Sequence, residues 1–133
     1  MNQVSDPQDK RTILVVDDDD SIRLLYRRYL QRLGFDVVEA SNGVEGLARL
    51  KETPCELVIT DIFMPEKEGL ETIREIRELY GADIAIIAIS GGGVMNAEVL
   101  LKMAGRIGAN AVFMKPVDLG ELSETITKLM ESA

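Results

Sequence analysis

The sequence predicts an α/β fold in which five parallel strands form one doubly wound sheet with helices on both faces. First, apolar runs of strand length alternate with segments of helical period, which is typical of repeated strand–helix units. Second, the runs at 12–17, 55–60 and 84–89 are almost continuously apolar, as expected of strands covered on both faces. Third, the 133 residues, 46% hydrophobic and 29% charged, have the size and composition of one globular domain.

The elements follow one another in a regular order after a polar start. Residues 1–11 are polar, contain Asp6-Pro7 and lack periodicity, so we expect a flexible segment there and one domain over 12–133. The predicted strands cover 12–17, 35–40, 55–60, 84–89 and 111–114. The predicted helices cover 20–33, 44–53, 67–80, 95–107 and 118–131.

Local patterns support the individual elements. Gly34 fits the left-handed residue that ends the first helix, and Gly81 and Gly108 fit the same role for the third and fourth helices. Charge interrupts the second strand, so we place it at the sheet edge, which gives the strand order 2-1-3-4-5. The first helix has an apolar stripe of Ile22, Leu25, Tyr26, Tyr29, Leu30 and Leu33. The last helix has a similar stripe of Leu122, Ile126, Leu129 and Met130.

Charge and composition narrow the classes of function. The formal net charge of −8 repels phosphate backbones and anionic lipid, so we expect no direct nucleic-acid partner. The longest wholly apolar run, Ile84 to Ile89, is too short to cross a bilayer, and the N-terminus lacks the apolar core of a signal peptide. We therefore expect a cytoplasmic protein without membrane insertion. The absence of histidine removes the usual general base, and the single Cys55 has no disulfide partner in the chain.

Polar and charged residues stand at the ends of four predicted strands. Asp17 and Asp18 follow the first strand, and Asp61 follows the third. Ser90 ends the fourth strand, and Lys115 follows the fifth. Because ligands bind where the carboxyl ends of parallel strands meet, we expect these side chains to converge on one rim. Like charges about 4 Å apart repel by about 4 kcal/mol at an effective dielectric of about 20, so the cluster requires a cation. Oxygen ligands without His or Cys favour Mg²⁺, with Mn²⁺ as a substitute.

The sequence has four consecutive aspartates at 17–20, and the last two have a simpler interpretation. Asp19 and Asp20 lie at the predicted start of the first helix. An aspartate there accepts backbone N–H bonds and favours the positive end of the helix dipole. We expect one of them to cap this helix and neither to bind the metal.

Four stretches together carry a family resemblance: VVDDDDS, VITDIFMPEKEGLE, the strand end IAIS, and GANAVFMKP. From residue 12 onward the chain resembles the receiver domain of two-component response regulators, which has a flavodoxin-like fold. The resemblance implies that Asp61 is the phosphoacceptor and binds Mg²⁺ together with Asp17 and Asp18. It also implies that the backbone carbonyl of Phe63 completes the metal site and that the bond between Lys115 and proline is cis.

The chemistry of these residues agrees with the resemblance. Ionised Asp61 can attack phosphorus and form an acyl phosphate if the charge on the phosphoryl oxygens is neutralised. Mg²⁺ and the ammonium of Lys115 would neutralise that charge, and the Ser90 hydroxyl would donate a hydrogen bond to a phosphoryl oxygen. By resemblance, the donor is a sensor histidine kinase or a histidine phosphotransfer protein. We expect the chain to catalyse only its own phosphorylation and dephosphorylation.

The sequence departs from the family at the position of an aromatic residue whose ring usually changes its orientation when the domain is phosphorylated. Receiver domains usually carry Tyr or Phe three residues before the strand-five lysine, where this chain has Val112. Phe113 is adjacent, but strand alternation directs it to the opposite face. The loop from Ser90 to Val94 reads SGGGV, and we expect this glycine-rich loop and the helix 95–107 to move in place of the ring.

Output is expected to occur by protein docking. Because the chain ends shortly after the fifth predicted helix, we expect no output domain within these 133 residues. The expected docking face is formed by the fourth helix, fifth strand and fifth helix, as in the family. Its apolar candidates, some of which must belong to the core, are Val99, Leu100, Met103, Ile107 and Met130.

Two other functions compete with phosphoacceptance. A haloacid-dehalogenase-type phosphatase also uses a strand-end aspartate, Mg²⁺, a hydroxyl and a lysine, and Asp17-x-Asp19 matches its first motif. That family needs a further acidic pair after the lysine, whereas here Pro116-Val117-Asp118 leads directly into the final helix. The second alternative is a binding module that keeps the fold without being phosphorylated.

Overall fold

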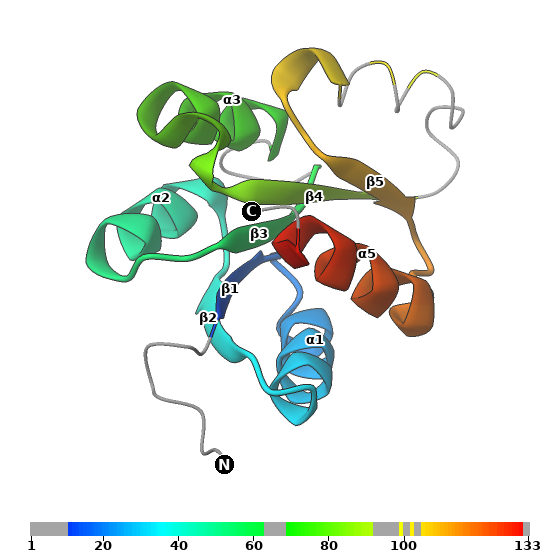
Figure 1. The fold of residues 1–133 in the computed structure, drawn as a ribbon. Helices are drawn as coiled ribbons and strands as arrows, with labels where there is room; N and C mark the ends of the chain where they lie inside the picture. Colours follow the sequence, from blue (N-terminus) through cyan, green and yellow to red (C-terminus); the bar gives the residue numbers. More distant parts are fainter. Residues whose placement is uncertain (1–10, 63–68, 92–98, 100–101, 103–104, 132–133) are drawn as a thin grey trace.

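The computed structural model describes residues 11–62, 69–91, 99, 102 and 105–131. They form a five-stranded sheet with strand order β2-β1-β3-β4-β5, and each neighbouring pair is parallel (Figure 1). The strands are β1 (Thr12–Val16), β2 (Asp36–Ala40), β3 (Leu57–Asp61), β4 (Ala85–Ser90) and β5 (Ala111–Met114). The predicted fold class and strand order are confirmed, with strand ends within two residues of expectation.

Helices α1 and α5 cover one face of the sheet, and α2 and α3 cover the other (Figure 1). Their bounds are α1 (Asp20–Arg32), α2 (Gly43–Glu52), α3 (Gly69–Tyr80) and α5 (Leu119–Glu131). A short 3₁₀ helix, η2 (Gly81–Asp83), was not predicted from the sequence. Residues 99, 102 and 105–107 are helical, as predicted for 95–107. The predicted lead-in, apart from its last residue, lies outside the described residues.

The alternation of side chains along each strand builds two separate cores. In β1, Ile13 and Val15 point toward α1 and α5, whereas Leu14 and Val16 point toward α2 and α3. All four are buried, because a central parallel strand has helices on both faces. From α1, Tyr26 and Leu30 are buried in the same core as Ile13 and Val15. Leu25 and Leu33 of the predicted stripe are 49% and 47% exposed. The apolar stripe predicted for α1 is therefore wider than the surface of the helix that packs against the sheet.

Helix ends follow the predicted chemistry. Asp19 is the N-cap of α1, and its carboxylate accepts bonds from the N–H groups of Ser21 and Ile22 at 2.8 and 3.2 Å. Gly34 and Gly108 have φ of 100° and 102°, in the left-handed region that side chains with a Cβ rarely adopt. These turns reverse the chain so that each helix is followed by a parallel strand.

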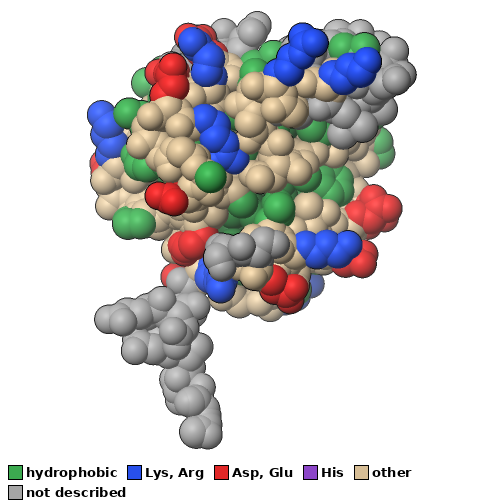
Figure 2. Space-filling view, turned by 45° about the horizontal axis from the view of Figure 1, so that its top comes forward, with side chains coloured by type: hydrophobic (Ala, Val, Ile, Leu, Met, Phe, Trp, Pro, Cys, Tyr) green, Lys and Arg blue, Asp and Glu red, His purple; other side chains and the backbone are tan. Residues whose placement is uncertain are grey.

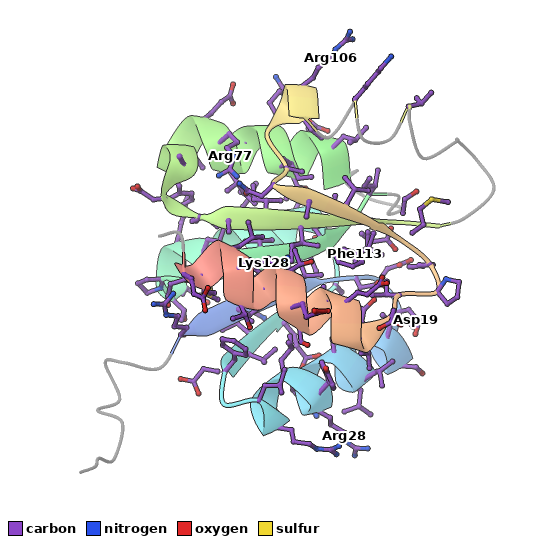
Figure 3. The ribbon with its side chains drawn as sticks, turned by 45° about the vertical axis from the view of Figure 1, so that its right-hand side comes forward. Asp19, Arg28, Arg77, Arg106, Phe113 and Lys128 are labelled. Carbon is purple, nitrogen blue, oxygen red and sulfur yellow. The ribbon has the colours of Figure 1, made fainter. Side chains whose placement is uncertain are left out.

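Arg77 on α3 fastens the end of the sheet at which β4 and β5 begin. Its guanidinium donates to the carbonyl oxygens of Gly81 and Ile84 at 2.7 and 2.5 Å. It also donates to the Gly108 carbonyl and to Asn110 Oδ1, both at 2.8 Å. Figure 3 shows Arg77 and Asp19 at opposite ends of the sheet. We refer to Arg77 and these four partners as the Arg77 clamp.

The surface shows no separation of charge on the face drawn in Figure 2. Basic and acidic side chains are both scattered over it, with apolar side chains between them. In the part of the chain that the structure describes, no helix combines the length and apolarity needed to span a membrane.

Candidate functional site

The strand ends bring the predicted acids together at one rim of the sheet. Asp17 directly follows β1, and Asp61 is the last residue of the neighbouring strand β3. Carboxylate oxygens of Asp17, Asp18 and Asp61, one from each, lie within 4.8 Å of one another. Asp17 and Asp61 are only 2% and 5% exposed, whereas Asp18 is exposed. Such an oxygen-only donor set with one side open to solvent fits a hard divalent cation.

Lys115, which directly follows β5, adds a positive charge to the cluster. Its ammonium Nζ lies 2.9 Å from Asp61 Oδ2 and 3.8 Å from Asp17 Oδ2. Its backbone N–H donates to the carbonyl of Ser90 at 2.8 Å, so β4 places the start of this side chain. The bond from Lys115 to Pro116 is cis, as the family resemblance implied. The structure thus places the predicted lysine beside the predicted acceptor.

Burial and charge act on the ionisation of this cluster. Burial raises the pKa of Asp17, and the charges of Asp61 and Asp18 raise it further. The backbone N–H of Asp19, which donates to Asp17 Oδ1 at 2.9 Å, and the charge of Lys115 act in the opposite direction. Burial alone would lower the pKa of Lys115, but the bond to Asp61 and the two acidic charges outweigh it and raise that pKa. The ammonium therefore stays charged at neutral pH.

The raised pKa of Asp17 predicts that its charge destabilises the metal-free fold. A carboxyl group with a raised pKa stabilises the folded state at low pH, and this contribution is lost as pH rises through the raised value. We therefore expect Asp17→Asn to raise the melting temperature at pH 7 in EDTA by a few degrees. The gap between the variant and the wild type should close as the pH is lowered. Scanning calorimetry over pH measures both effects.

A control separates this local effect from a change in net charge. Asp83→Asn removes one exposed carboxylate from η2, at the opposite end of β4 from Ser90, and should leave the melting temperature nearly unchanged. A lower melting temperature for Asp17→Asn would contradict the direction of the pKa shift.

Ser90 lies at the rim as predicted, but its hydroxyl is engaged with the backbone. Ser90 is the last residue of β4 and is 1% exposed. Its Oγ donates to the carbonyl of Gly91 at 3.2 Å. The Phe63 carbonyl and most of the SGGGV loop lie outside the described residues. The described part of the predicted site thus comprises three acids, one lysine and one hydroxyl.

Gly69 has a steric role that the sequence did not reveal. It begins α3, and its N–H donates to the carbonyl of Ile62 at 2.8 Å. A Cβ at this position would overlap the carbonyl oxygen of Asp61 and lie 2.7 Å from the Cα of Ile62. Since both obstacles are backbone atoms, no side-chain rotation relieves the overlap. Only glycine lets α3 begin against the backbone of Asp61 and Ile62.

We expect Gly69→Ala to destabilise the fold by about 3 kcal/mol, because the methyl group must push α3 away from β3. Denaturant unfolding measures the loss. Gly105→Ala is the matched control, because Gly105 is helical and a methyl group added there would have nothing within 4 Å. This control should be neutral or stabilise by up to about 1 kcal/mol. Equal stability of the two variants would refute the steric role of Gly69.

Arg23 is a second contributor that the sequence did not single out. Its Nη1 donates to the backbone carbonyl of Asp17 at 2.5 Å, and its Nε donates to Glu39 Oε1 at 3.3 Å. Another guanidinium nitrogen contacts the carboxylate of Asp20. One sequence signal could have identified it. Arg23 lies about one helical turn after the acids, so its long side chain can reach back to the end of β1.

Tyr26 brings an apolar pocket next to the acids. Burial raises the pKa of its phenol, and the charge of Asp17 raises it further. The sequence assigned Tyr26 only to the core stripe and gave no sign of this position. The pocket has a volume of about 430 Å³ and is lined by Ile22, Leu25, Tyr26, Lys115, Pro116 and Val117.

The predicted departure at β5 is confirmed in its geometry. Val112 packs against the core under α2 and α3, and Phe113 packs against the core under α1 and α5. The ring of Phe113 is therefore on the wrong face to replace an aromatic residue at 112. Among the docking candidates, Val99 is 41% exposed, whereas Ile107 packs against the core and Met130 is buried. Leu100 and Met103 lie outside the described residues.

Comparisons with known proteins agree with this geometry. The chain is 33% identical over 126 residues to the sensor protein EvgS of Escherichia coli, covering 94% of this chain and 10% of EvgS. It is 31% identical to the probable C4-dicarboxylate response regulator DctR of Halalkalibacterium halodurans, covering 90% of this chain and 51% of DctR. The chain thus spans only a part of these curated relatives.

Solved structures show the same fold. A response regulator receiver domain protein from Clostridium thermocellum superimposes with a TM-score of 0.83 at 31% identity, covering 92% of this chain and 95% of that one. The chemotaxis protein CheY4 of Vibrio cholerae superimposes with a TM-score of 0.81 at 26% identity, covering 90% and 98%. The family model described as the response regulator receiver domain matches residues 13–127. With the acid rim, the parallel sheet and this match in agreement, the chain belongs to the response regulator receiver domain family.

Proposed function

We propose that Asp61 accepts a phosphoryl group from a phosphohistidine and thereby serves as the phosphorylation site of this receiver domain. The observation that carries the proposal is the Asp61 carboxylate, 5% exposed, with the Lys115 ammonium 2.9 Å away. In the transfer, a carboxylate oxygen of Asp61 forms a bond to phosphorus while the donor's N–P bond breaks. The electron pair of that bond remains on the imidazole nitrogen, so atoms and charge balance.

The residues that would hold the divalent cation are Asp17, Asp18 and Asp61, with the backbone carbonyl of Phe63 as a fourth ligand. Receiver domains bind Mg²⁺ at an acidic pocket, and the clustered carboxylates of this chain support the same site, which Mn²⁺ would also fit. When bound, the cation offsets negative charge on the carboxylates and on the phosphoryl oxygens. Burial is the main cause of the raised pKa of Asp17, and the bound cation would offset the smaller contribution from the charges of Asp61 and Asp18.

Lys115 and Ser90 would serve the phosphoryl group directly. The Lys115 ammonium supplies a fixed positive charge beside the oxygen of Asp61 that it already contacts. The Ser90 hydroxyl, which donates to Gly91 in this structure, would exchange that carbonyl for a phosphoryl oxygen. Both groups stabilise charge that develops during transfer and neither needs to gain or lose a proton.

The proposed phosphohistidine lies outside this sequence, because none of the 133 residues is histidine. We propose a sensor histidine kinase or a histidine phosphotransfer protein in the cytoplasm as the phosphoryl donor. Sensor proteins among the relatives, EvgS and the sensor kinase CckA of Brucella abortus, support the assignment. We further propose that output proceeds by protein docking at the face of the fourth helix, β5 and α5, where Val99 and Met114 are 41% and 39% exposed.

We do not propose direct nucleic-acid binding or turnover of a separate substrate. The net charge of −8 disfavours a polyanion, and the matched family is a signalling family. The phosphatase alternative is not favoured, because the Asp19 carboxylate that would belong to its first motif caps α1. The unphosphorylated binding module remains the outcome if the acceptor fails the following test.

Incubation with acetyl phosphate and MgCl₂ tests phosphoacceptance without the native donor. We expect intact mass spectrometry to show one added phosphoryl group. Chelation of the metal with EDTA before the reaction should abolish the adduct, because the carboxylate cluster would keep its full negative charge. An unchanged mass in the presence of Mg²⁺ would favour the binding module instead.

A further inference from the structure

Arg23 ties the metal-site backbone to two other elements. It lies in the second turn of α1, and its side chain is only 14% exposed. One guanidinium nitrogen donates to the backbone carbonyl of Asp17 at 2.5 Å, and the opposite side of the group donates to Glu39 near the end of β2. A third contact joins it to Asp20 in the first turn of α1. A single planar group thus joins the ends of β1 and β2 to α1.

The carbonyl that Arg23 holds belongs to the peptide between two of the proposed metal ligands. The N–H of Asp17 donates to the carbonyl of Ala40 at 3.1 Å, and Asp17 Oδ1 accepts from the N–H of Asp19 at 2.9 Å. With the Asp17 carbonyl held by Arg23, the Asp17–Asp18 peptide cannot rotate without breaking a charge-assisted bond. The orientation of this peptide sets the direction in which the Asp18 side chain leaves the backbone.

Electrostatics alone would give Arg23 the opposite effect. A positive charge near the rim repels a divalent cation, so its removal would strengthen metal binding. The charge of Arg23 is, however, already paired with Asp20 and Glu39, and Glu39 is shared with Arg27 at 2.7 Å. Because these carboxylates compensate the charge of Arg23, its net repulsion of a cation at the rim is small. Removal of Arg23, in contrast, takes away the charge-assisted bond that fixes the Asp17 carbonyl. Geometry should therefore dominate over repulsion.

We propose that Arg23 is a positioning residue for the divalent cation, acting through the Asp17–Asp18 peptide. This inference rests on the proposed function of the acid rim. Partners that orient metal ligands typically change affinity by about 10- to 100-fold when they are removed. Loss of Arg23 should weaken Mg²⁺ binding while leaving all three carboxylates in place.

Calorimetric titration with MgCl₂ tests the proposal. Arg23→Met keeps an apolar stem of similar reach and removes every donor, and we expect about tenfold weaker Mg²⁺ binding than in the wild type. Arg23→Lys keeps the charge but not the planar fork, so its affinity should fall between the two. Arg27→Met is the matched control, because Arg27 contacts Glu39 from the next turn of the same helix without touching Asp17. Its Mg²⁺ affinity should stay within about twofold of the wild type.

The outcomes separate the inference from the function on which it rests. If the wild type binds no Mg²⁺, the proposed metal site fails, and the role of Arg23 fails with it. If the wild type binds Mg²⁺ and Arg23→Met binds it equally or more tightly, the metal site stands and the positioning role is refuted. Equal weakening by Arg27→Met would also refute it, by showing a general effect of lost charge on α1. Thermal unfolding of each variant in EDTA confirms that the compared proteins are folded.

Discussion

Asp61→Asn is expected to abolish the phosphoryl adduct entirely. An amide oxygen is a poor nucleophile at phosphorus, and the variant keeps the size and surroundings of the buried side chain. Its amide group can still accept a hydrogen bond from Lys115, so the fold should survive the change. The measurement is intact mass after incubation with acetyl phosphate and MgCl₂, followed by comparison with the wild type under the same conditions.

The control for this variant is Asp83→Asn, an equally conservative change at an exposed position far from the rim. It should be phosphorylated as fully as the wild type. A persistent adduct on Asp61→Asn would show that another carboxylate accepts the group. Fragmentation of the labelled protein would then show whether Asp17 or Asp18 carries it, and the proposed assignment of roles within the cluster would be wrong.

Lys115→Gln should slow phosphorylation by about 100-fold or more while it strengthens Mg²⁺ binding. The ammonium lies 2.9 Å from Asp61 Oδ2, so its loss removes a preorganised charge from the oxygens of the transferred group. The same loss leaves the acids less neutralised, which increases their attraction for a cation. Rates from mass spectrometry and affinities from calorimetry should therefore move in opposite directions.

That opposition distinguishes a direct role from general damage. A variant with a disturbed fold would lose both rate and affinity. Lys51→Gln, an exposed change near the end of α2, is the control and should alter neither quantity. The effect of the Lys115 charge on stability should be present at neutral pH, because its pKa is raised and the charge is lost only as the pH rises through that value. Weaker Mg²⁺ binding by Lys115→Gln would contradict this account.

The convergence at the rim could be predicted because it depends on topology and little else. Once β1, β3, β4 and β5 are parallel neighbours, residues that end these strands must meet, whatever the details of packing. Helix capping separately predicted that Asp19 and Asp20 lie outside the cluster, and Asp19 is the one that directs its carboxylate to backbone N–H groups. Strand alternation likewise separated Val112 from Phe113 before any contact was known.

Other features depend on distances that sequence patterns do not contain. The approach of Gly69 to the Asp61 carbonyl is a contact between two backbones, and a glycine near the start of a predicted helix has many alternative explanations. Arg23 and Arg27 are both basic residues outside the apolar stripe of the helical pattern, yet only Arg23 reaches the carbonyl of Asp17. Tyr26 is an ordinary member of an apolar stripe until its position beside Lys115 is seen.

The Arg77 clamp ties several segments together at one end of the sheet. One side chain links the end of α3, the start of β4 and the turn before β5 through four hydrogen bonds. Arg77 lies at the end of the sheet opposite to Asp19, as Figure 3 shows. We therefore expect slow amide hydrogen exchange at this end of the sheet, because opening it would break several bonds of the clamp at once.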